Sequence, residues 1–397
     1  MRDFLPGDTS RHLPVYVKGS DLPVPVIYYH SVGEKNPGWG RNFLTLETPY
    51  FEDQIKYFSR HYTVISLTDL LDIREGIRKP VKNPLVITFD DGYLDNWVWA
   101  FPVLKKYNTK ATIFVSPEFI DPRPVVRPTV RDAEEGSVSH KEIRQWGFLS
   151  WDEMRIMEQS GLADIQSHTM SHSKLFVSDI LTGFHPGYDS FYQTCNHFKE
   201  RKPFCISDPG FNQLLKPGYP LFEERSAIIA REVTINNDFT EQCVEILKDY
   251  DFNRYDFSIA RGKVRPLYEH YKTQDRLITA IETEEAYLKR LHYEISESKM
   301  IIERALNKRV DIIAWPHGDT SKEAVETAFA AGYRAMTSGK LRFPEDDLRI
   351  IPARIGTSCY GNSRFLTLLR ARHKVNRYIK KFPYSQIDSI YRKIKGR

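Results

Sequence analysis

Apolar and polar residues follow two patterns along this chain, one of short apolar runs and one of longer periodic segments. Short runs of mostly apolar residues, such as Pro84–Phe89 and Ala111–Val115, are typical of strands that are buried on both faces. Longer segments in which apolar residues recur every three or four positions predict helices. Because the two patterns follow each other repeatedly, the chain predicts an α/β fold with a parallel sheet.

The predicted elements fall into two stretches, one before residue 175 and one after residue 283. We predict strands over residues 24–29, 63–66, 84–89, 111–115, 163–167, 311–315, 334–338 and 348–355. We predict helices over residues 50–60, 67–75, 95–107, 151–160, 284–307 and 321–331. No internal repeat or low-complexity segment interrupts this order.

Two short strings in the first stretch carry the candidate chemistry. Ile87–Tyr93 ends a predicted strand with the adjacent carboxylates of Asp90 and Asp91, at the end where α/β folds collect catalytic groups. A second string, after another predicted strand, places His168 and His172 four residues apart, where we expect them to share one helix face. One aspartate and two histidines suit a metal-dependent hydrolase that keeps an open position for water.

Each string alone has an ordinary structural explanation. Two aspartates after a strand are usually a helix cap or a solvated turn, and a histidine pair at this spacing is usually a surface or core pair. Their coincidence in one chain, each behind a predicted strand, favours the metal site. One divalent metal is therefore the expected cofactor, with Zn²⁺ as the default and Ni²⁺, Co²⁺ and Fe²⁺ as ions that also fit.

The strings TFDDG (Thr88–Gly92) and SHTMSH (Ser167–His172) together resemble the polysaccharide deacetylases, carbohydrate esterases of family four that share the nodulation-deacetylase homology domain. Further matching motifs lie at Val24–Val32, Phe51–Leu71, Ala111–Val115, Phe148–Trp151 (before the expected metal-binding helix), Ala314–Gly318 and Ile351–Ile355. The resemblance covers residues 22–174 and 284–358. It implies a distorted (β/α)7 barrel that removes N-acetyl groups from sugars.

The resemblance also implies roles for individual residues. Asp91, His168 and His172 would bind the metal, and Asp90 would be the general base. The backbone N–H groups near His317 would form an oxyanion hole. That motif is Pro316, His317 and Gly318.

The general acid and the partner of the base depart from the common pattern. Many members supply the acid from a late Leu-x-His strand, which this chain lacks, and His373 lies in a basic helical tail. A permuted branch that deacetylates poly-N-acetylglucosamine supplies it from the first strand, where this chain has His30, so we predict His30 as the acid. A core histidine that orients the aspartates remains the alternative. Ala314 replaces the family's arginine, and Arg354 is a conjectured substitute partner for Asp90.

The domain organisation follows from where the resemblance stops. We expect a barrel from residues 1–174 with 284–360, an insertion over 175–283, and a basic helical tail over 361–397. The insertion is rich in Pro, Gly, Tyr and Phe, and helices are predicted in it over residues 221–231, 239–250 and 265–270. Since it directly follows His172, we expect it to overhang the site as a lid or specificity subdomain. A packing insertion or an oligomer contact is the alternative.

Composition limits the location of the protein and leaves its oligomeric state open. The four cysteines, at 195, 205, 243 and 359, show no metal-binding spacing and are expected to be free thiols in a reducing compartment. The first residues contain no apolar signal segment, and no run of 18 apolar residues exists. We therefore expect a cytoplasmic protein whose N-acetylated substrate is a sugar nucleotide, an oligosaccharide or a lipid-linked glycan.

Charge is concentrated at the end of the chain. Residues 364–397 hold eleven Lys or Arg and one Asp, a net charge of +10, whereas the whole chain is +5. Apolar residues at near-helical spacing accompany these charges, so peripheral contact with the inner face of an anionic membrane is one expectation. A solvated helix packed on the barrel is the other, and nucleic acid is disfavoured because no recognition motif is present.

The sequence thus predicts a metal-dependent hydrolase that removes an N-acetyl group from an amino sugar in a glycan or glycan precursor. A deformylase or another hydrolase of small C–N amides on the same fold stays open, because a fold does not choose the acyl group. A non-catalytic glycan-binding protein on a deacetylase fold also stays open.

Overall fold

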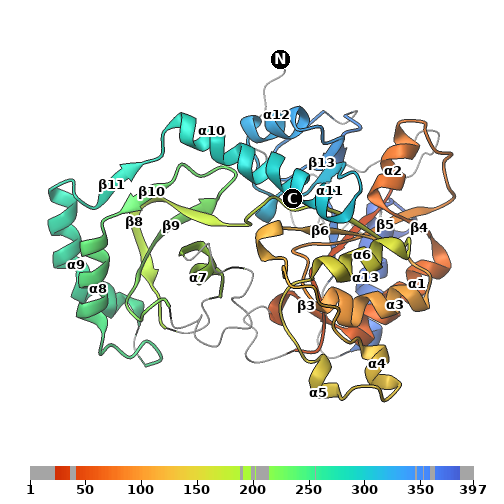
Figure 1. Cartoon of the computed structure of the whole chain (residues 1–397), viewed down its shortest axis with the longest axis horizontal. Coiled ribbons are helices and arrows are strands. Elements are labelled where there is room, and N and C mark those ends of the chain that lie inside the picture. Colours follow the sequence, from red (N-terminus) through yellow and green to blue (C-terminus); the bar gives the residue numbers. More distant parts are fainter. Residues whose placement is uncertain are drawn as a thin grey trace.

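The computed structural model describes residues 23–35, 42–187, 191–197, 202, 214–254, 256–344, 347–351, 353–357 and 363–384. Within them, one curled sheet of nine strands organises the molecule (Figure 1). Its order is β14-β13-β12-β7-β6-β5-β1-β15, with β4 paired to β5 beside this path. All pairings between its described strands are parallel, so the predicted α/β fold and distorted barrel are confirmed.

Three predicted strands have the predicted bounds, namely β5 (Pro84–Phe89), β6 (Ala111–Val115) and β7 (Ala163–Ser167). Most of the others are shorter than predicted: β1 (Val26–Tyr29), β4 (Thr63–Ile65), β12 (Ile312–Ile313) and β13 (Ala335–Thr337). The central strands are bounded most sharply because they are buried on both faces, so polar residues mark their ends.

The last predicted strand, over residues 348–355, is wrong as a single element. It is two strands, β14 (Ile350–Ile351) and β15 (Ile355–Gly356), which lie at opposite ends of the sheet order. Four residues of extended chain reach about 13 Å at most. The two ends of the sheet must therefore lie close together, so the sheet curls nearly into a closed barrel without pairing its edges among the described strands.

The helices that cover the sheet all lie where the sequence predicts helices, although α3 starts later than predicted and the helix predicted over 284–307 is divided. They are α1 (Thr48–His61), α2 (Leu67–Arg74), α3 (Phe101–Lys106), α6 (Trp151–Gln159), α10 (Glu284–His292), α11 (Ser298–Leu306) and α12 (Lys322–Ala330). Two predicted helices contain π-helical segments, at Asn96–Ala100 and Tyr293–Glu297. Such segments often occur at functional sites, and both of these touch the site described below.

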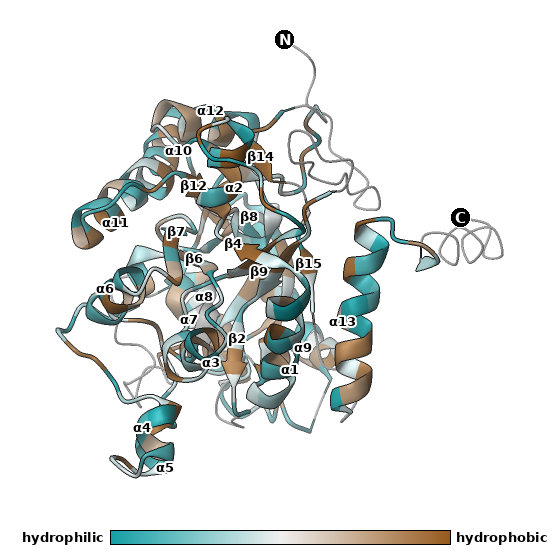
Figure 2. Ribbon diagram, turned by 90° about the vertical axis from the view of Figure 1, so that its right-hand side faces the viewer, coloured by the Kyte–Doolittle hydropathy of each residue, from teal (hydrophilic) through white to brown (hydrophobic). Residues whose placement is uncertain are grey.

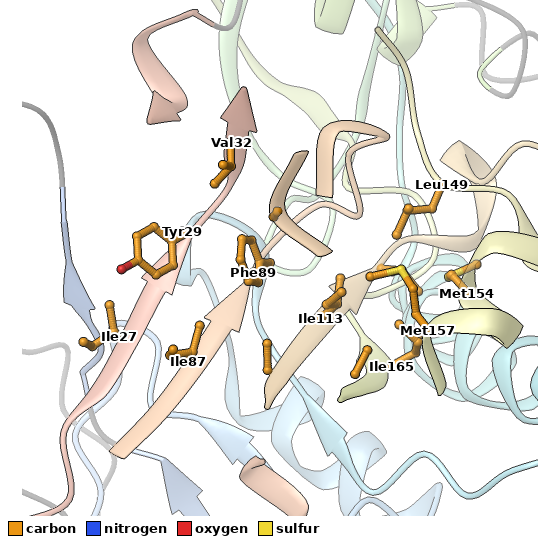
Figure 3. Packing of buried hydrophobic residues seen from close by; sticks show 14 of the residues in the cluster. Ile27, Tyr29, Val32, Ile87, Phe89, Ile113, Leu149, Met154, Met157 and Ile165 are labelled. Atoms are coloured by element: carbon orange, nitrogen blue, oxygen red, sulfur yellow. The ribbon is translucent and has the colours of Figure 1, made fainter. Parts of the chain in front are cut away.

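The core lies between the sheet and these helices. Isoleucines of neighbouring strands sit in register, Ile27 beside Ile87 and Ile113 beside Ile165. Figure 3 shows their side chains pointing to the same side of the sheet, where they meet aromatic and methionine side chains. This layer fixes the strands, and therefore the side chains at their carboxyl ends.

The insertion forms a lobe beside the barrel (Figure 1). A long antiparallel pair, β8 (Lys174–Phe184) and β9 (Pro220–Ser226), leads into it. The rest is a second pair, β10 (Val233–Ile235) and β11 (Ile278–Ile281), with α7 (Phe191–His197), α8 (Asn237–Leu247) and α9 (Phe257–Thr273). It has its own apolar cluster, in which Phe222, Phe239 and Val264 are fully buried.

Prediction was weakest in this lobe. The helix over 221–231 is wrong, because β9 pairs with β8 there and buries Phe222. The helix over 239–250 corresponds to α8, and that over 265–270 is part of the longer α9. Neither β8 nor β9 was predicted.

The tail is helical as far as it is described. Helix α13 (Arg364–Tyr378) packs against α1, and residues 385–397 of the predicted tail lie outside the described residues. Cys195 and Cys243 are buried thiols, while Cys205 and Cys359 are outside the described part. No helix of the described chain is both long and apolar enough to cross a bilayer.

Candidate active site

The two aspartates lie directly after β5, at the carboxyl edge of the sheet, and both are buried. The backbone turns sharply here, with φ of 73° at Asp91 and 68° at Gly92. A Cβ on Gly92 would lie 2.8 Å from Val115 Cγ1, so only glycine fits. The turn places both carboxylates in the wall of the cavity described below.

The two histidines do not share a helix, so that prediction is wrong. Residues 168–173 form a loop between β7 and β8, with φ of 64° at Thr169 and 49° at His172. The loop folds back so that the imidazole rings approach with centroids 5.1 Å apart. A helix is excluded because β7 ends at Ser167 and β8 starts at Lys174, which leaves room only for a tight loop.

Asp91 and the two histidines fit a metal site. Nε2 of His168 and Nε2 of His172 each lie 3.3 Å from Asp91 Oδ1. Ligands about 2.0–2.1 Å from a tetrahedral ion lie about 3.3 Å apart. Asp91 Oδ1 is buried and accepts no hydrogen bond from the described residues, which a bound cation would remedy. The structure brings these three groups together within 4.8 Å.

Burial and neighbouring charges shift the pKa values of Asp91 and His168. Burial acts to raise the pKa of Asp91, but the charge of His172 and the close approach of both imidazole rings outweigh it and hold the pKa well below its usual range. Burial acts to lower the pKa of His168, yet its contacts with Asp91 and Asp90 raise it overall. Asp91 is therefore ionised, as a metal ligand must be.

A second layer of contacts orients His168. Its Nδ1 donates to the carbonyl oxygen of Ala314 at 2.9 Å, which leaves Nε2 facing Asp91. Its own carbonyl accepts from Ser116 Oγ at 2.9 Å. Such outer hydrogen bonds set the tautomer and ring direction of metal-binding histidines. Ala314 thus contributes to the site through its backbone.

Glu294 holds the histidine loop and was missed by the sequence analysis. It is buried within the second π-helical segment, and its carboxylate accepts from the backbone N–H of Ser171 at 3.0 Å and from the Ser171 hydroxyl. Its carbonyl accepts from Met170 N–H at 2.9 Å. Lys202 reinforces the same loop by donating to the Ser171 carbonyl at 2.9 Å. No local pattern marks either residue, because both lie far from the histidines in sequence.

Asp90 pairs with Arg354, as conjectured from the sequence. Nη1 and Nη2 of Arg354 lie 2.5 and 2.8 Å from the two carboxylate oxygens, and the guanidinium stacks over Tyr28. Burial acts to raise the pKa of Asp90, but the charges of Arg354, His168 and His30 lower it overall. The carboxylate stays ionised and is held by a two-point contact.

His30 faces the same carboxylate from the end of β1. Its Nε2 lies 3.9 Å from Asp90 Oδ2, and its side chain is 24% exposed, so it is open to the cavity described below. Two residues that sequence reasoning missed brace this strand end. Asn96 Nδ2 donates to the His30 carbonyl at 2.8 Å, and Asp95 accepts from Ser31 Oγ and from Asn96.

The predicted oxyanion motif lies across the site from Asp90. His317 has φ of 58° and stands edge-on to His172, with ring centroids 4.7 Å apart. Burial, helped by the charge of His172, lowers the pKa of His317 to about 3. Pro316 is buried, and Gly318 has φ of 70°. The motif therefore presents a neutral imidazole and a tight backbone turn to the site.

One cavity of about 600 Å³ joins these groups. Barrel residues line it, including Tyr28, Phe43, Trp315 and every predicted site residue except Pro316. The insertion adds Lys174, Asn196 and Glu224, none of which the sequence analysis singled out. Lys174 Nζ lies 3.0 Å from Glu224 Oε1, so the insertion contributes an ion pair to the wall. The insertion therefore reaches the site, as expected for a segment that follows His172.

Parts of the chain are similar to known proteins. Residues 78–202 match the family model described as polysaccharide deacetylase. The Bacillus subtilis (strain 168) protein YxkH is 31% identical over 153 residues, which are 38% of this chain and 44% of that protein. The poly-beta-1,6-N-acetyl-D-glucosamine N-deacetylase of Escherichia coli (strain K12) is 20% identical over 184 residues, 44% of this chain and 26% of that protein. The chain thus spans less than half the length of these relatives.

Among solved structures, a de-N-acetylase from Aggregatibacter actinomycetemcomitans aligns with a TM-score of 0.47 at 18% identity. The alignment covers 84% of this chain and 93% of that one.

Proposed function

We propose that the protein removes an N-acetyl group from an amino sugar of a glycan in a metal-dependent hydrolysis, as the match of residues 78–202 to the polysaccharide deacetylase model supports. One observation carries the proposal. Asp91, His168 and His172 converge at the spacing of a tetrahedral metal site, beside the ionised Asp90, in a single cavity. A glycan-binding protein would not need an unbonded buried carboxylate oxygen at that point.

Asp91, His168 and His172 would hold the ion. When bound, a divalent cation activates water and polarises the amide carbonyl. Zn²⁺ is the default for these donors, and Ni²⁺, Co²⁺ or Fe²⁺ also suit them. The outer contacts from Ala314 and Glu294 keep the imidazoles in place before any ion arrives.

Asp90 serves as the general base in this proposal. Arg354 binds both carboxylate oxygens through one side, which leaves the remaining lone pairs free to accept a proton from the attacking water. The guanidinium also keeps Asp90 ionised, so the base is ready over a wide pH range.

His30 serves as the general acid that protonates the leaving amine. It opens into the cavity from β1, and its Nε2 lies 3.9 Å from Asp90 Oδ2. His317, the other candidate from the sequence, fits this role poorly because its pKa is lowered to about 3, so it holds no proton to donate near neutral pH. The backbone around His317 and Gly318 instead suits stabilisation of the developing oxyanion.

The substrate is an N-acetylated sugar in this proposal. The cavity combines aromatic faces, at Tyr28 and Trp315, with polar groups at its insertion side, which is how sugar rings and their hydroxyls are bound. Similarity to the poly-beta-1,6-N-acetyl-D-glucosamine N-deacetylase of Escherichia coli supports a hexosamine polymer or its precursor. A lipid-linked glycan and a cytoplasmic location remain predictions.

The test is release of acetate from N-acetylglucosamine oligomers by the metal-loaded protein, with wild type and Asp90→Asn compared. We expect acetate from wild type and a loss of about 10²–10⁴-fold in turnover for the variant. Formate released from an N-formyl sugar, without acetate, would replace the proposal by a deformylase. Sugar binding by a metal-loaded protein that releases no acid would indicate a non-catalytic glycan-binding protein.

A further inference from the structure

Helix α13 has one packed side and one exposed apolar side. Thr367, Ala371 and Val375 are buried against the barrel. The opposite side exposes large apolar side chains: Phe365 is 71% exposed, Leu366 42%, Leu369 41% and, just after the helix, Phe382 75%. Packing on the barrel therefore does not account for the exposed apolar residues of this helix.

Basic residues surround this exposed side without any acid among them. Residues 363–384 contain no Asp or Glu. They contain seven Lys or Arg, which are Arg364, Arg370, Arg372, Lys374, Arg377, Lys380 and Lys381. Some of these charges are used inside the protein: Arg364 pairs with Asp53, and Lys374 donates to the Gly356 carbonyl. The exposed Lys380 and Lys381 follow the helix beside Phe382.

The apolar end of α13 lies at the same end of the barrel as the cavity. Arg364 at the start of α13 contacts Asp53 in the first half of α1, and Arg372 lies over Tyr57 one turn further along α1, so the two helices run in parallel. The start of α1 follows closely on Phe43, which lines the cavity and is itself 74% exposed. Figure 2 shows the brown, apolar end of α13 at the end of the molecule where β2 (Ser31–Gly33) lies. Strand β2 begins directly after His30.

We propose that this face of α13, defined by Phe365, Leu366, Leu369, Phe382, Lys380 and Lys381, binds an anionic membrane surface. Apolar side chains would enter the headgroup boundary, and the lysines would remain beside the lipid phosphates. Phe365, Leu366 and Leu369 lie near the start of α13, at the cavity end of the barrel, and Lys380, Lys381 and Phe382 follow its other end. The membrane would therefore lie along the length of the helix. The proposal does not depend on the chemistry of the cavity.

Charge complementarity favours a membrane over other partners. The described tail carries seven positive charges, whereas the whole chain carries a net charge of only +5, so the rest of the molecule is slightly acidic. A second copy would bring like charge against like charge at this face. A nucleic acid would neutralise the lysines but leave the phenylalanines in water, and no groove-reading element accompanies them. An anionic bilayer satisfies both the charges and the apolar side chains.

The experiment is co-sedimentation of the full chain with vesicles at low salt. Vesicles of phosphatidylglycerol mixed with phosphatidylcholine should bind the protein, and pure phosphatidylcholine should not. The double variant Phe365→Ala/Leu369→Ala should weaken binding about tenfold or more. Lys380→Glu/Lys381→Glu should weaken it by a similar factor, and binding should fall as salt rises.

A matched control lies on α10, away from α13 in Figures 1 and 2. Leu288 is 45% exposed and Lys289 is exposed. Leu288→Ala/Lys289→Glu removes the same kind of groups and should leave vesicle binding unchanged. Circular dichroism of all variants checks that they are folded.

Three results would overturn the proposal. The first is a wild-type protein that stays in the supernatant with anionic vesicles at low salt. The second is a control variant that loses as much binding as the α13 variants. The third is self-association or DNA binding that the α13 variants abolish while vesicles bind neither them nor wild type.

Discussion

The barrel and the insertion meet at one cavity but contribute to it in different ways. The barrel supplies the ionised carboxylates, the histidines and Arg354. Hydrogen bonds to Ala314 and Glu294 hold His168 and the histidine loop in place. The insertion supplies Lys174, Asn196 and Glu224, from β8, α7 and β9. The buried barrel residues are suited to catalysis, and Lys174, Asn196 and Glu224 in the cavity wall are suited to substrate selection. The difference suggests that reaction and specificity can be separated by mutation.

The largest effect is expected on the barrel side. Asp91→Ala or His168→Ala removes one of three ligands, so both bound metal and turnover should be lost, well beyond the about 10–100-fold cost of losing an outer-shell partner. Elemental analysis of the purified variants measures the metal, and acetate release measures turnover. Full metal occupancy in both variants would show that the ion lies elsewhere.

His30→Gln should be the next most severe. The variant keeps a hydrogen-bonding side chain but cannot donate a proton as imidazolium does, so kcat should fall about 10²–10⁴-fold with metal retained. The alkaline limb of the pH–rate profile should disappear. His317→Gln serves as the comparison, since His317 is already neutral, with a pKa of about 3. A larger loss in His317→Gln than in His30→Gln would reverse the two roles.

Glu294→Ala tests whether the barrel's outer contacts matter. Without the carboxylate that holds Ser171, the histidine loop should become less ordered, and metal affinity should fall about 10–100-fold. Competition with a chelator measures this affinity without any assay of activity. Glu297→Ala, in the same π-helical segment, is the control and should bind metal normally. Equal affinities in the two variants would mean that the loop is held by its other contacts.

On the insertion side, Glu224→Gln should act on substrate choice alone. The substitution breaks the ion pair with Lys174 at the cavity wall and leaves the metal site intact. We expect KM for a sugar oligomer to rise about three- to tenfold with kcat nearly unchanged, because the interaction is uniform binding. A fall in kcat with constant KM would place Glu224 in the chemistry and remove the division between the two regions.

The smallest effect on turnover is expected from Asp95→Asn, which should change stability instead. Burial raises the pKa of Asp95 from 3.8 to about 7, against hydrogen bonds from Ser31, Val32 and Asn96 that lower it. As pH rises from about 4 to about 7, the unfolded chain releases this proton and the folded protein keeps it. The stability of the folded state should therefore fall over that window, by about 1.4 kcal/mol per pH unit at most.

Asparagine cannot ionise, so the variant should lose this dependence on pH. Thermal unfolding of wild type and variant between pH 4 and pH 8 measures the difference. Parallel curves would mean that Asp95 is ionised in the folded protein.

Local pattern predicted the centre of the barrel well. Strands β5 and β6 have the predicted bounds because both faces of each are buried, so a mostly apolar run with polar residues beyond its ends marks its length. The insertion was predicted poorly for the opposite reason. Its strands are half-exposed, and Leu221–Ser226 mixes apolar and charged residues in a way that also suits a helix.

The sequence by itself determined the kinds of groups in the site: two aspartates after a buried strand, two histidines after another, and a glycine where φ must be positive. Only the tertiary structure decided which distant groups meet them. Arg354 is 264 positions from Asp90, and Glu294 is 123 from Ser171. The spacing of residue types along the chain shows the periodicity of a single helix or strand. Contacts between elements depend on how the sheet curls. Strands β14 and β15 are only four residues apart in sequence, and the curl lets them occupy opposite ends of the strand order.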